Sequence, residues 1–151
     1  MKKKLNINEK IKSFNKTIKV NGDKSISIRW LILSSLALGR SRLINLLKSE
    51  DVLSTIECLK KLGVKITLRK NVCEVHGKGI NGLNYKKNLV LNAGNSGTLS
   101  RLLFGLLIKT PFPIKIVGDK SLSLRDFKRV IVPIKKFGAN FTPKNNFKLP
   151  I

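Results

Sequence analysis

Three short segments each combine small residues, hydroxyl groups and one arginine, a pattern suited to binding an anion. They are Gly22–Arg29, Asn92–Arg101 and Gly118–Arg125. Small residues let backbone N–H groups approach a ligand, and a helix N-terminus presents free N–H groups and the positive end of the helix dipole. Arginine binds carboxylate or phosphate through two parallel hydrogen bonds. The three segments therefore predict a site for negatively charged metabolites.

The arginines occupy positions that are unfavourable in an ordinary helix. Arg29, Arg101 and Arg125 all lie within the first turns of expected helices, where a cation opposes the helix dipole at a cost of about 0.3–1 kcal/mol. Three such placements in one small chain indicate that a bound anion offsets this term. Lys24 adds a compact charge beside Ser25. We therefore expect the three guanidinium groups to converge on one pocket.

One of the segments is repeated within the chain. Gly22-Asp-Lys-Ser-Ile-Ser-Ile-Arg29 recurs as Gly118-Asp-Lys-Ser-Leu-Ser-Leu-Arg125, with six of the eight positions identical. A purely structural explanation is that Asp23 and Asp119 cap helices while the arginines extend into solvent. Repetition of the whole Lys-Ser-x-Ser-x-Arg spacing favours the anion site over that explanation.

Other kinds of site find no support in the sequence. It contains no GxxxxGK[ST] loop, and Gly77-Lys-Gly79 is too short for a dinucleotide motif. Cys58, Cys73 and the single His76 lack the spacing of a zinc module, so we predict no metal and no cofactor. The pair Glu50-Asp51 opens an expected helix and is explained more simply by capping than by acid/base chemistry.

The composition limits the class of protein. A chain of 151 residues, 42% of them hydrophobic, is long enough for one domain, and no apolar run approaches the ~20 residues of a membrane helix. Lys and Arg number 31 against 8 Asp and Glu, a net charge of +23. The basic residues are scattered and not interleaved with aromatic ones, which favours a solvated surface over a specific nucleic-acid platform. The basic N-terminus lacks a following apolar segment and the cysteines are few, so we expect a cytoplasmic protein without a secretory signal.

Hydrophobic periodicity predicts alternating strands and helices, and hence an α+β fold. The expected strands are 17–20, 88–91, 113–117, one beginning at 139–142, and a hairpin of 64–68 with 72–75. The expected helices are 25–38, one opened by 49–51 and closed by Gly63, 99–108, and 125–137 with Pro133 inside it. The segments 92–98 and 118–123 are expected to be turns that join a strand to a helix.

In this order, the three segments resemble the signature regions of the 5-enolpyruvylshikimate-3-phosphate synthase (EPSP synthase) family. Gly22–Arg29 is similar to the first signature, Asn92–Thr98 with Arg101 to the second, and Gly118–Arg125 to the third. The resemblance runs from about Val20 to Ile151. It implies an enolpyruvyl transferase-like lobe of repeated βαβαββ units, an inside-out α/β barrel, with the substrate site in the cleft between two such lobes.

The resemblance also implies a reaction and the residues that serve it. The family transfers the enolpyruvyl group of phosphoenolpyruvate to the 5-hydroxyl of shikimate 3-phosphate and releases phosphate, a step toward the aromatic amino acids. Lys24, Ser25 and Arg29 would bind shikimate 3-phosphate, with Lys24 also a catalytic residue that reaches phosphoenolpyruvate. The phosphoenolpyruvate site would comprise Lys24, Asn95, Gly97, Thr98, Arg101 and Arg125. The resemblance implies a monomer, no metal and no other cofactor.

The chain departs from the family pattern at three positions and in extent. Asn21, Ile28 and Asp126 stand where the family usually has Pro, His and Pro, and Asp126 places a negative charge beside Arg125. Residues 21–151 correspond to part of an amino-terminal lobe, and residues 1–20 to a segment that packs with a second lobe in the family. That second lobe and its acid/base carboxylates have no counterpart here, so we expect weak ligand binding and no turnover by the chain alone. A companion chain that supplies the second lobe stays an open alternative.

Three other functions also stay open. A UDP-N-acetylglucosamine enolpyruvyl transferase shares the fold, but that family carries Lys-Asn in place of Lys24-Ser25 and a loop cysteine that 109–125 lack. A basic nucleic-acid-binding module would bind unrelated DNA in a salt-dependent way, insensitive to shikimate 3-phosphate. A remnant with a structural role would fail to fold alone.

Overall fold

The computed structural model describes residues 4, 6, 8, 10, 12, 13, 15–144 and 146–151, and has the mixed α+β composition that the periodicity predicts. The helices are α1 (Lys24–Leu36), α2 (Glu50–Lys61), α3 (Gly97–Leu106), α4 (Lys120–Ser123) and α5 (Lys128–Lys135). The strands are β1 (Leu38–Ile44), β2 (Lys65–Arg69), β3 (Val72–Lys78), β4 (Val90–Asn92) and β5 (Lys115–Val117). Within the described residues, none of the helices has the length and apolarity needed to cross a bilayer.

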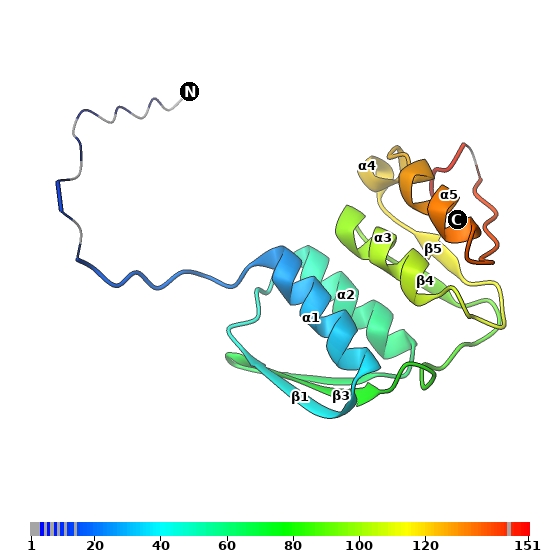
Figure 1. Ribbon diagram of the computed structural model, residues 1–151, viewed down its shortest axis with the longest axis horizontal. Helices are drawn as coiled ribbons and strands as arrows, with labels where there is room; N and C mark the ends of the chain where they lie inside the picture. The colour runs from blue at the N-terminus through cyan, green and yellow to red at the C-terminus, as the bar shows by residue number, and fades with distance from the viewer. Residues whose placement is uncertain are drawn as a thin grey trace.

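An antiparallel sheet and two helices form the first half of the fold. The strand order is β1-β3-β2, and β2 and β3 make the expected hairpin, with Leu68 opposite Cys73. Helices α1 and α2 lie side by side over one face of this sheet (Figure 1). Strand β1 was not predicted from the sequence, because residues 38–44 are mostly exposed and show no apolar alternation.

A two-stranded parallel sheet organises the second half. Leu91 of β4 is paired with Ile116 of β5, and α3 and α5 pack together beside the two strands (Figure 1). Phe104 of α3 makes edge-to-face contacts with Phe127 and Phe141, a geometry favoured by the aromatic quadrupole. Since parallel strands end at the same edge of a sheet, the segments after β4 and β5 lie together. The Asp119 N–H donates to the Gly94 carbonyl at 2.9 Å across that edge.

A single cluster of buried apolar residues runs through both halves. Leu31, Leu59, Leu103 and Phe127 are all fully buried within it. Cys58 and Cys73 are buried free thiols in the same cluster, as expected from their positions on the inner face of a helix and on a strand. The core thus fixes the starts of α1 and α3 relative to the sheet edges.

The expected strand at 17–20 does not form. Residues 15–20 are exposed and extend away from the body of the fold (Figure 1). The alternation of Thr17-Ile-Lys-Val20 is the pattern of a strand, but the described part of the chain offers no neighbouring strand to supply its hydrogen bonds, and a lone strand is not stable. Of the predicted 1–20 segment, residues 1–3, 5, 7, 9, 11 and 14 lie outside the described residues.

The region from 118 to 142 also differs from expectation. A short helix, α4, occupies part of the predicted turn 118–123, and α5 begins at Lys128, later than the predicted start at 125. Asp126 accounts for this late start, because its Oδ1 accepts the Lys128 N–H at 2.6 Å and forms a local turn. Residues 139–142 do not form a strand.

Candidate anion-binding site

The start of α1 carries the first predicted segment. Asp23 is the N-cap, and its Oδ1 accepts the Ile26 N–H at 2.7 Å. The Lys24 ammonium makes an ion pair with Asp51 Oδ2 at 3.0 Å and so joins the starts of α1 and α2. Arg29 Nη1 donates to the carbonyl of Ser25 at 3.1 Å. The exposed Arg29 guanidinium therefore contacts the backbone of the first turn of its own helix.

Two of the predicted guanidinium groups meet at the start of α3. Ser96 caps the helix, with its Oγ accepting the Leu99 N–H at 3.2 Å. A Cβ placed on Gly97 would lie 2.7 Å from Arg101 Nη1 and 2.9 Å from Arg125 Nη1. Glycine at position 97 therefore leaves room for both cations over the first turn of α3. Thr98, the next residue, is half-buried in that turn.

Arg101 is held from two sides. Its Nη1 donates to the Gly97 carbonyl at 3.0 Å, the same contact to the first turn that Arg29 makes in α1. The centre of its guanidinium lies 5.5 Å from the centroid of the Phe127 ring, within the range of a cation–π interaction. Because Phe127 is fully buried, this contact anchors the guanidinium to the core.

Arg125 is held by polar side chains that follow the two parallel strands. Its Nη2 donates to Asn95 Oδ1 at 2.9 Å, and Asn95 Nδ2 donates to Asp119 Oδ2 at 2.6 Å. Asp119 Oδ1 accepts the Leu122 N–H at 2.7 Å as the N-cap of α4. The Leu122 N–H, the Asn95 amide and the Arg125 charge all act to lower the pKa of Asp119.

The structure brings four of the predicted site residues into contact, places Thr98 beside them in the first turn of α3, and leaves Lys24, Ser25 and Arg29 on α1. Asn95, Gly97, Arg101 and Arg125 form one cluster, which we call the Gly97 cluster. The α1 residues Lys24, Ser25 and Arg29 make no hydrogen bond or ion pair to this cluster in the described part of the chain, although α1 packs on α3. Arg101 and Arg125 therefore lie together over Gly97, while the convergence of Arg29 with them stays a prediction.

The expectation that each arginine sits at a helix start is wrong for Arg125. Arg29 and Arg101 lie in the second turns of α1 and α3, but Arg125 follows the end of α4 and precedes α5. Because α4 ends at Ser123, Arg125 is free of the helix and reaches Asn95 instead of its own backbone.

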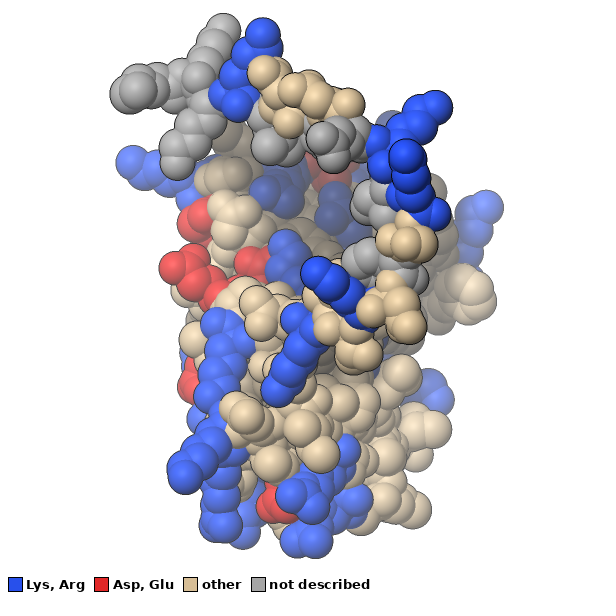
Figure 2. Space-filling model, turned by 90° about the vertical axis from the view of Figure 1, so that its left-hand side faces the viewer, with Lys and Arg blue, Asp and Glu red and all other residues tan. Residues whose placement is uncertain are grey.

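Basic side chains are widespread on the face that carries the start of α1. Figure 2 shows Lys and Arg over much of this face, with acidic side chains mostly along one side of it. Asp51 is one carboxylate close to the predicted cations, and it is engaged by Lys24. An excess of basic side chains on this face favours the approach of anions.

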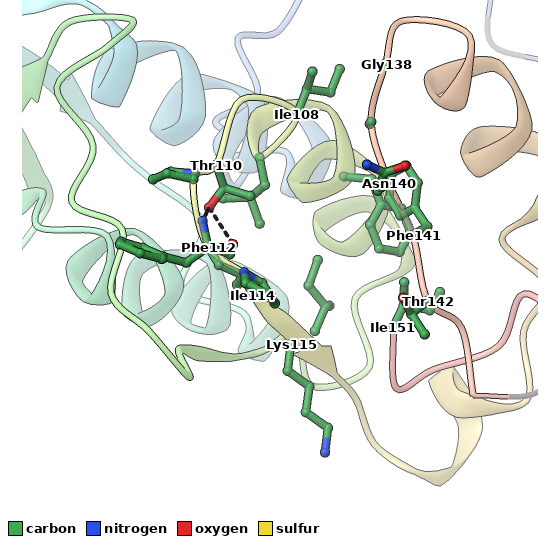
Figure 3. A pocket seen from close by; sticks show the side chains of 16 residues that line it. Ile108, Thr110, Phe112, Ile114, Lys115, Gly138, Asn140, Phe141, Thr142 and Ile151 are labelled. Atoms are coloured by element: carbon green, nitrogen blue, oxygen red, sulfur yellow. Dashed lines mark hydrogen bonds between the residues drawn. The ribbon is translucent and has the colours of Figure 1, made fainter.

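A cavity that was not predicted lies away from the Gly97 cluster. It has a volume of about 500 Å³ and lies between the C-terminal end of α3, β5 and residues 138–142. Its lining is mainly apolar and includes Ile108, Ile114, Phe141 and Ile151 (Figure 3). None of the predicted site residues lines it. The run of Ile, Phe and Pro between 108 and 116 is the only sequence signal for it, and such a run is equally typical of core.

Metal ligands are not gathered anywhere in the described residues. No group of three or more His, Cys, Asp or Glu side chains there is placed to hold a metal ion. Burial raises the pKa of both the Cys58 and Cys73 thiols to about 11, so neither is a ready nucleophile at neutral pH.

Comparisons with known proteins place this geometry in context. The family described as EPSP synthase (3-phosphoshikimate 1-carboxyvinyltransferase) matches residues 8–151. The 3-phosphoshikimate 1-carboxyvinyltransferases of two Streptococcus pyogenes strains, serotype M2 (MGAS10270) and serotype M1, are each 45% identical over 134 residues. Each alignment covers 89% of this chain and 31% of the relative, so the chain spans about a third of the length of these relatives.

Solved structures give the same result. Two structures of EPSP synthase from Acinetobacter baumannii are similar to this chain, with TM-scores of 0.82 and 0.83 and sequence identities of 35% and 34%. The similarity covers 88% of this chain and 30% of each of those chains.

Proposed function

Because the chain belongs to the EPSP synthase family, we propose that it forms part of the substrate site of a 3-phosphoshikimate 1-carboxyvinyltransferase. In this proposal, the Gly97 cluster binds phosphoenolpyruvate and the start of α1 binds shikimate 3-phosphate. The convergence of Arg101 and Arg125 over Gly97 supports the proposal most directly. Two guanidinium groups that meet without a carboxylate between them are suited to a ligand with a carboxylate and a phosphate.

Each residue then has a role set by its position. Arg101 and Arg125 bind the anionic groups of phosphoenolpyruvate, while Gly97 and Thr98 form the surface against which it lies. Lys24 contacts both substrates, with its ammonium exchanging Asp51 for a substrate anion. Ser25 and Arg29 bind shikimate 3-phosphate. The transfer joins the 5-hydroxyl oxygen to the enolpyruvyl carbon and releases inorganic phosphate.

We expect binding without turnover by this chain alone. The reaction requires proton transfer, and the carboxylates described near the two groups are engaged. Asp51 is paired with Lys24, while Asp119 caps α4 and accepts from Asn95. Asp126 is turned toward the start of α5, where its Oδ1 accepts the Lys128 N–H. In the family the acid/base carboxylates belong to the second lobe, so we expect turnover to depend on that lobe.

We also propose that the chain forms part of one lobe of repeated βαβαββ units. Elements α1, β1, α2, β2 and β3 follow the order αβαββ, and β4, α3, β5, α4 and α5 follow βαβαα, in which α4 is a single short turn. Ile18 and Val20, which are 67% and 73% exposed, then belong to a segment whose strand partners lie in the second lobe.

Substrate binding by the purified chain tests the proposed function. Isothermal titration calorimetry with phosphoenolpyruvate and shikimate 3-phosphate should show binding, and an assay with both substrates should detect no phosphate release.

Arg125→Ala should weaken the affinity for phosphoenolpyruvate about 10- to 150-fold, because it removes a charged hydrogen bond of about 1.5–3 kcal/mol. Arg129→Ala removes the same charge from exposed α5 and should change the affinity little. Equal losses of affinity in the two variants would exclude Arg125 from the site. Steady phosphate release by the parent chain would refute the expectation that the chain alone has no turnover.

A further inference from the structure

The side chains of Asp119, Asn95 and Arg125 form a continuous hydrogen-bonded chain. It crosses from the segment after β5 to the segment after β4, with distances of 2.6 Å from Asn95 Nδ2 to Asp119 Oδ2 and 2.9 Å from Arg125 Nη2 to Asn95 Oδ1. Asp119 belongs to neither of the predicted substrate-binding groups. Its participation in this chain goes beyond capping α4, since the cap uses Oδ1 and the Asn95 contact uses Oδ2.

The chemistry of the three side chains fixes which group donates and which accepts in each of the two hydrogen bonds. An ionised carboxylate only accepts hydrogen bonds and a guanidinium only donates them. Asn95 must therefore turn its NH₂ toward Asp119 and its oxygen toward Arg125. Without Asp119, the amide of Asn95 could rotate and present its NH₂ to Arg125, where two donors would face each other.

From this geometry we propose that Asp119 is a positioning residue for Arg125, acting through the side-chain amide of Asn95. The inference rests on the role proposed above for Arg125. By orienting the Asn95 oxygen, Asp119 holds the Arg125 guanidinium over Gly97 beside Arg101.

The intervening amide also preserves the charge that a ligand needs. Among the ion pairs of the described residues, none joins Asp119 to Arg125. A direct ion pair would place a carboxylate where the substrate anion is to bind. An amide accepts the hydrogen bond without a full negative charge, so Arg125 is held in place and stays cationic toward a ligand.

The internal repeat supplies a natural comparison. Asp23 caps α1 through Oδ1 at 2.7 Å, as Asp119 caps α4. The arginine of that first copy, Arg29, donates to the backbone of its own helix. Asp23 has no side-chain amide partner in the described hydrogen bonds. Both copies of the repeat therefore have a capping aspartate, but only in the second copy is the aspartate joined to the arginine through an amide.

The test substitutes the two capping aspartates by asparagine, which caps a helix as well as aspartate does. In Asp119→Asn, the single amide oxygen serves the cap and no second oxygen remains for Asn95. Asp23→Asn makes the same chemical change where no such link exists. Nitrogen-15 NMR of the ligand-free chain reports the Arg125 Nε–H and the Asn95 side-chain amide, and calorimetry reports the affinity for phosphoenolpyruvate in parent and Arg125→Ala backgrounds.

We expect Asp119→Asn to shift both NMR signals and to weaken phosphoenolpyruvate about 2- to 12-fold, the equivalent of one hydrogen bond. In the Arg125→Ala background it should cause no further loss, since its effect passes through Arg125. Asp23→Asn should leave both signals in place. Unmoved signals in Asp119→Asn, or the same fold loss in both backgrounds, would overturn the positioning role. If the parent chain binds no phosphoenolpyruvate, the proposed function fails, and the NMR signals still decide the role of Asp119.

Discussion

Among single residues, Gly97 has the largest influence on the geometry of the Gly97 cluster. Its missing side chain leaves room for Arg101 Nη1 and Arg125 Nη1, which approach within 2.7 and 2.9 Å of the place a Cβ would take. Both neighbours are the ends of flexible side chains, so a methyl group there can be accommodated by moving them. A methyl group at position 97 would therefore displace the two guanidinium groups and leave the backbone in place. Such a substitution should affect ligand binding and leave the fold intact.

Gly97→Ala should therefore weaken phosphoenolpyruvate binding while leaving the fold intact. Moving two guanidinium groups off their preferred rotamers costs about 0.5–1.5 kcal/mol, or roughly 2- to 12-fold in affinity. The helix itself gains up to about 1 kcal/mol from the exchange of glycine for alanine. Calorimetry and urea denaturation measure the two effects. Gly105→Ala is the matched control, because Gly105 lies on the same helix with nothing within 4 Å of its Cβ position, and it should change stability alone.

The buried thiols predict how stability depends on pH. Burial is the main cause that raises the pKa of Cys58 and Cys73 to about 11 in the folded chain, from an ordinary value of 9.0. Between these values the unfolded chain releases protons that the folded chain keeps, so the free energy of unfolding falls as the pH rises. The loss at pH 10 should be on the order of 1 kcal/mol per thiol.

Urea denaturation at pH 8 and pH 10 measures that loss. Comparison with a chain in which both cysteines are replaced by alanine separates the thiols from the lysines, which also titrate in this range. A pH dependence that the double substitution leaves unchanged would show that the thiols do not contribute.

At the scale of elements, two serine N-caps behave differently. Ser96 Oγ caps α3 and accepts the Leu99 N–H. Ser49 is the N-cap residue of α2 but makes no side-chain cap, and its buried Oγ has no hydrogen-bond partner among the described residues. A lost cap costs about 0.5–2 kcal/mol, while removal of an unsatisfied buried hydroxyl relieves a desolvation penalty.

Ser96→Ala should lower the free energy of unfolding by about 0.5–2 kcal/mol, and Ser49→Ala should leave it unchanged or raise it. Denaturant titration of the two variants beside the parent measures both. A larger loss from Ser49→Ala than from Ser96→Ala would reverse the assignment of the caps.

The sequence predicted most helices and strands, but it missed β1 and the position at which α5 begins. Helices α1, α2 and α3 and the β2–β3 hairpin were predictable because their apolar spacing and capping residues agree. Strand β1 was missed because an exposed edge strand such as Leu38–Ile44 need not alternate. The late start of α5 depends on Asp126, whose turn competes with the helix that the apolar spacing of 125–137 favours.

The residues of the Gly97 cluster were predictable from the sequence, and their geometry was not. Spacing and resemblance identified Asn95, Gly97, Arg101 and Arg125, and the structure brings them together. The part played by Asp119 required the parallel pairing of β4 and β5, because that pairing places Gly94 and Asp119 side by side. Local sequence cannot specify a contact between residues 24 positions apart.

At the scale of the whole molecule, the net charge of +23 is the main electrostatic fact. Like charges on one small domain repel one another and favour expansion, and salt screens that repulsion. The Debye length shortens from about 30 Å at 0.01 M salt to about 8 Å at 0.15 M.

The melting temperature should therefore rise with sodium chloride between these two concentrations. A gain of about 1 kcal/mol corresponds to roughly 2–4 °C for a chain of this size, and differential scanning calorimetry is the measurement. A melting temperature that is constant or falls would indicate that local ion pairs such as Lys24–Asp51 outweigh the overall repulsion.

We propose that the Gly97 cluster binds a ligand that carries both a carboxylate and a phosphate. A crystal structure of the chain with phosphoenolpyruvate and shikimate 3-phosphate is the decisive test. Phosphoenolpyruvate should lie over Gly97, with its anionic groups within hydrogen-bonding distance of Arg101 and Arg125, and shikimate 3-phosphate should lie near Lys24. Phosphoenolpyruvate bound elsewhere in the crystal, with the two guanidinium groups unoccupied, would contradict it.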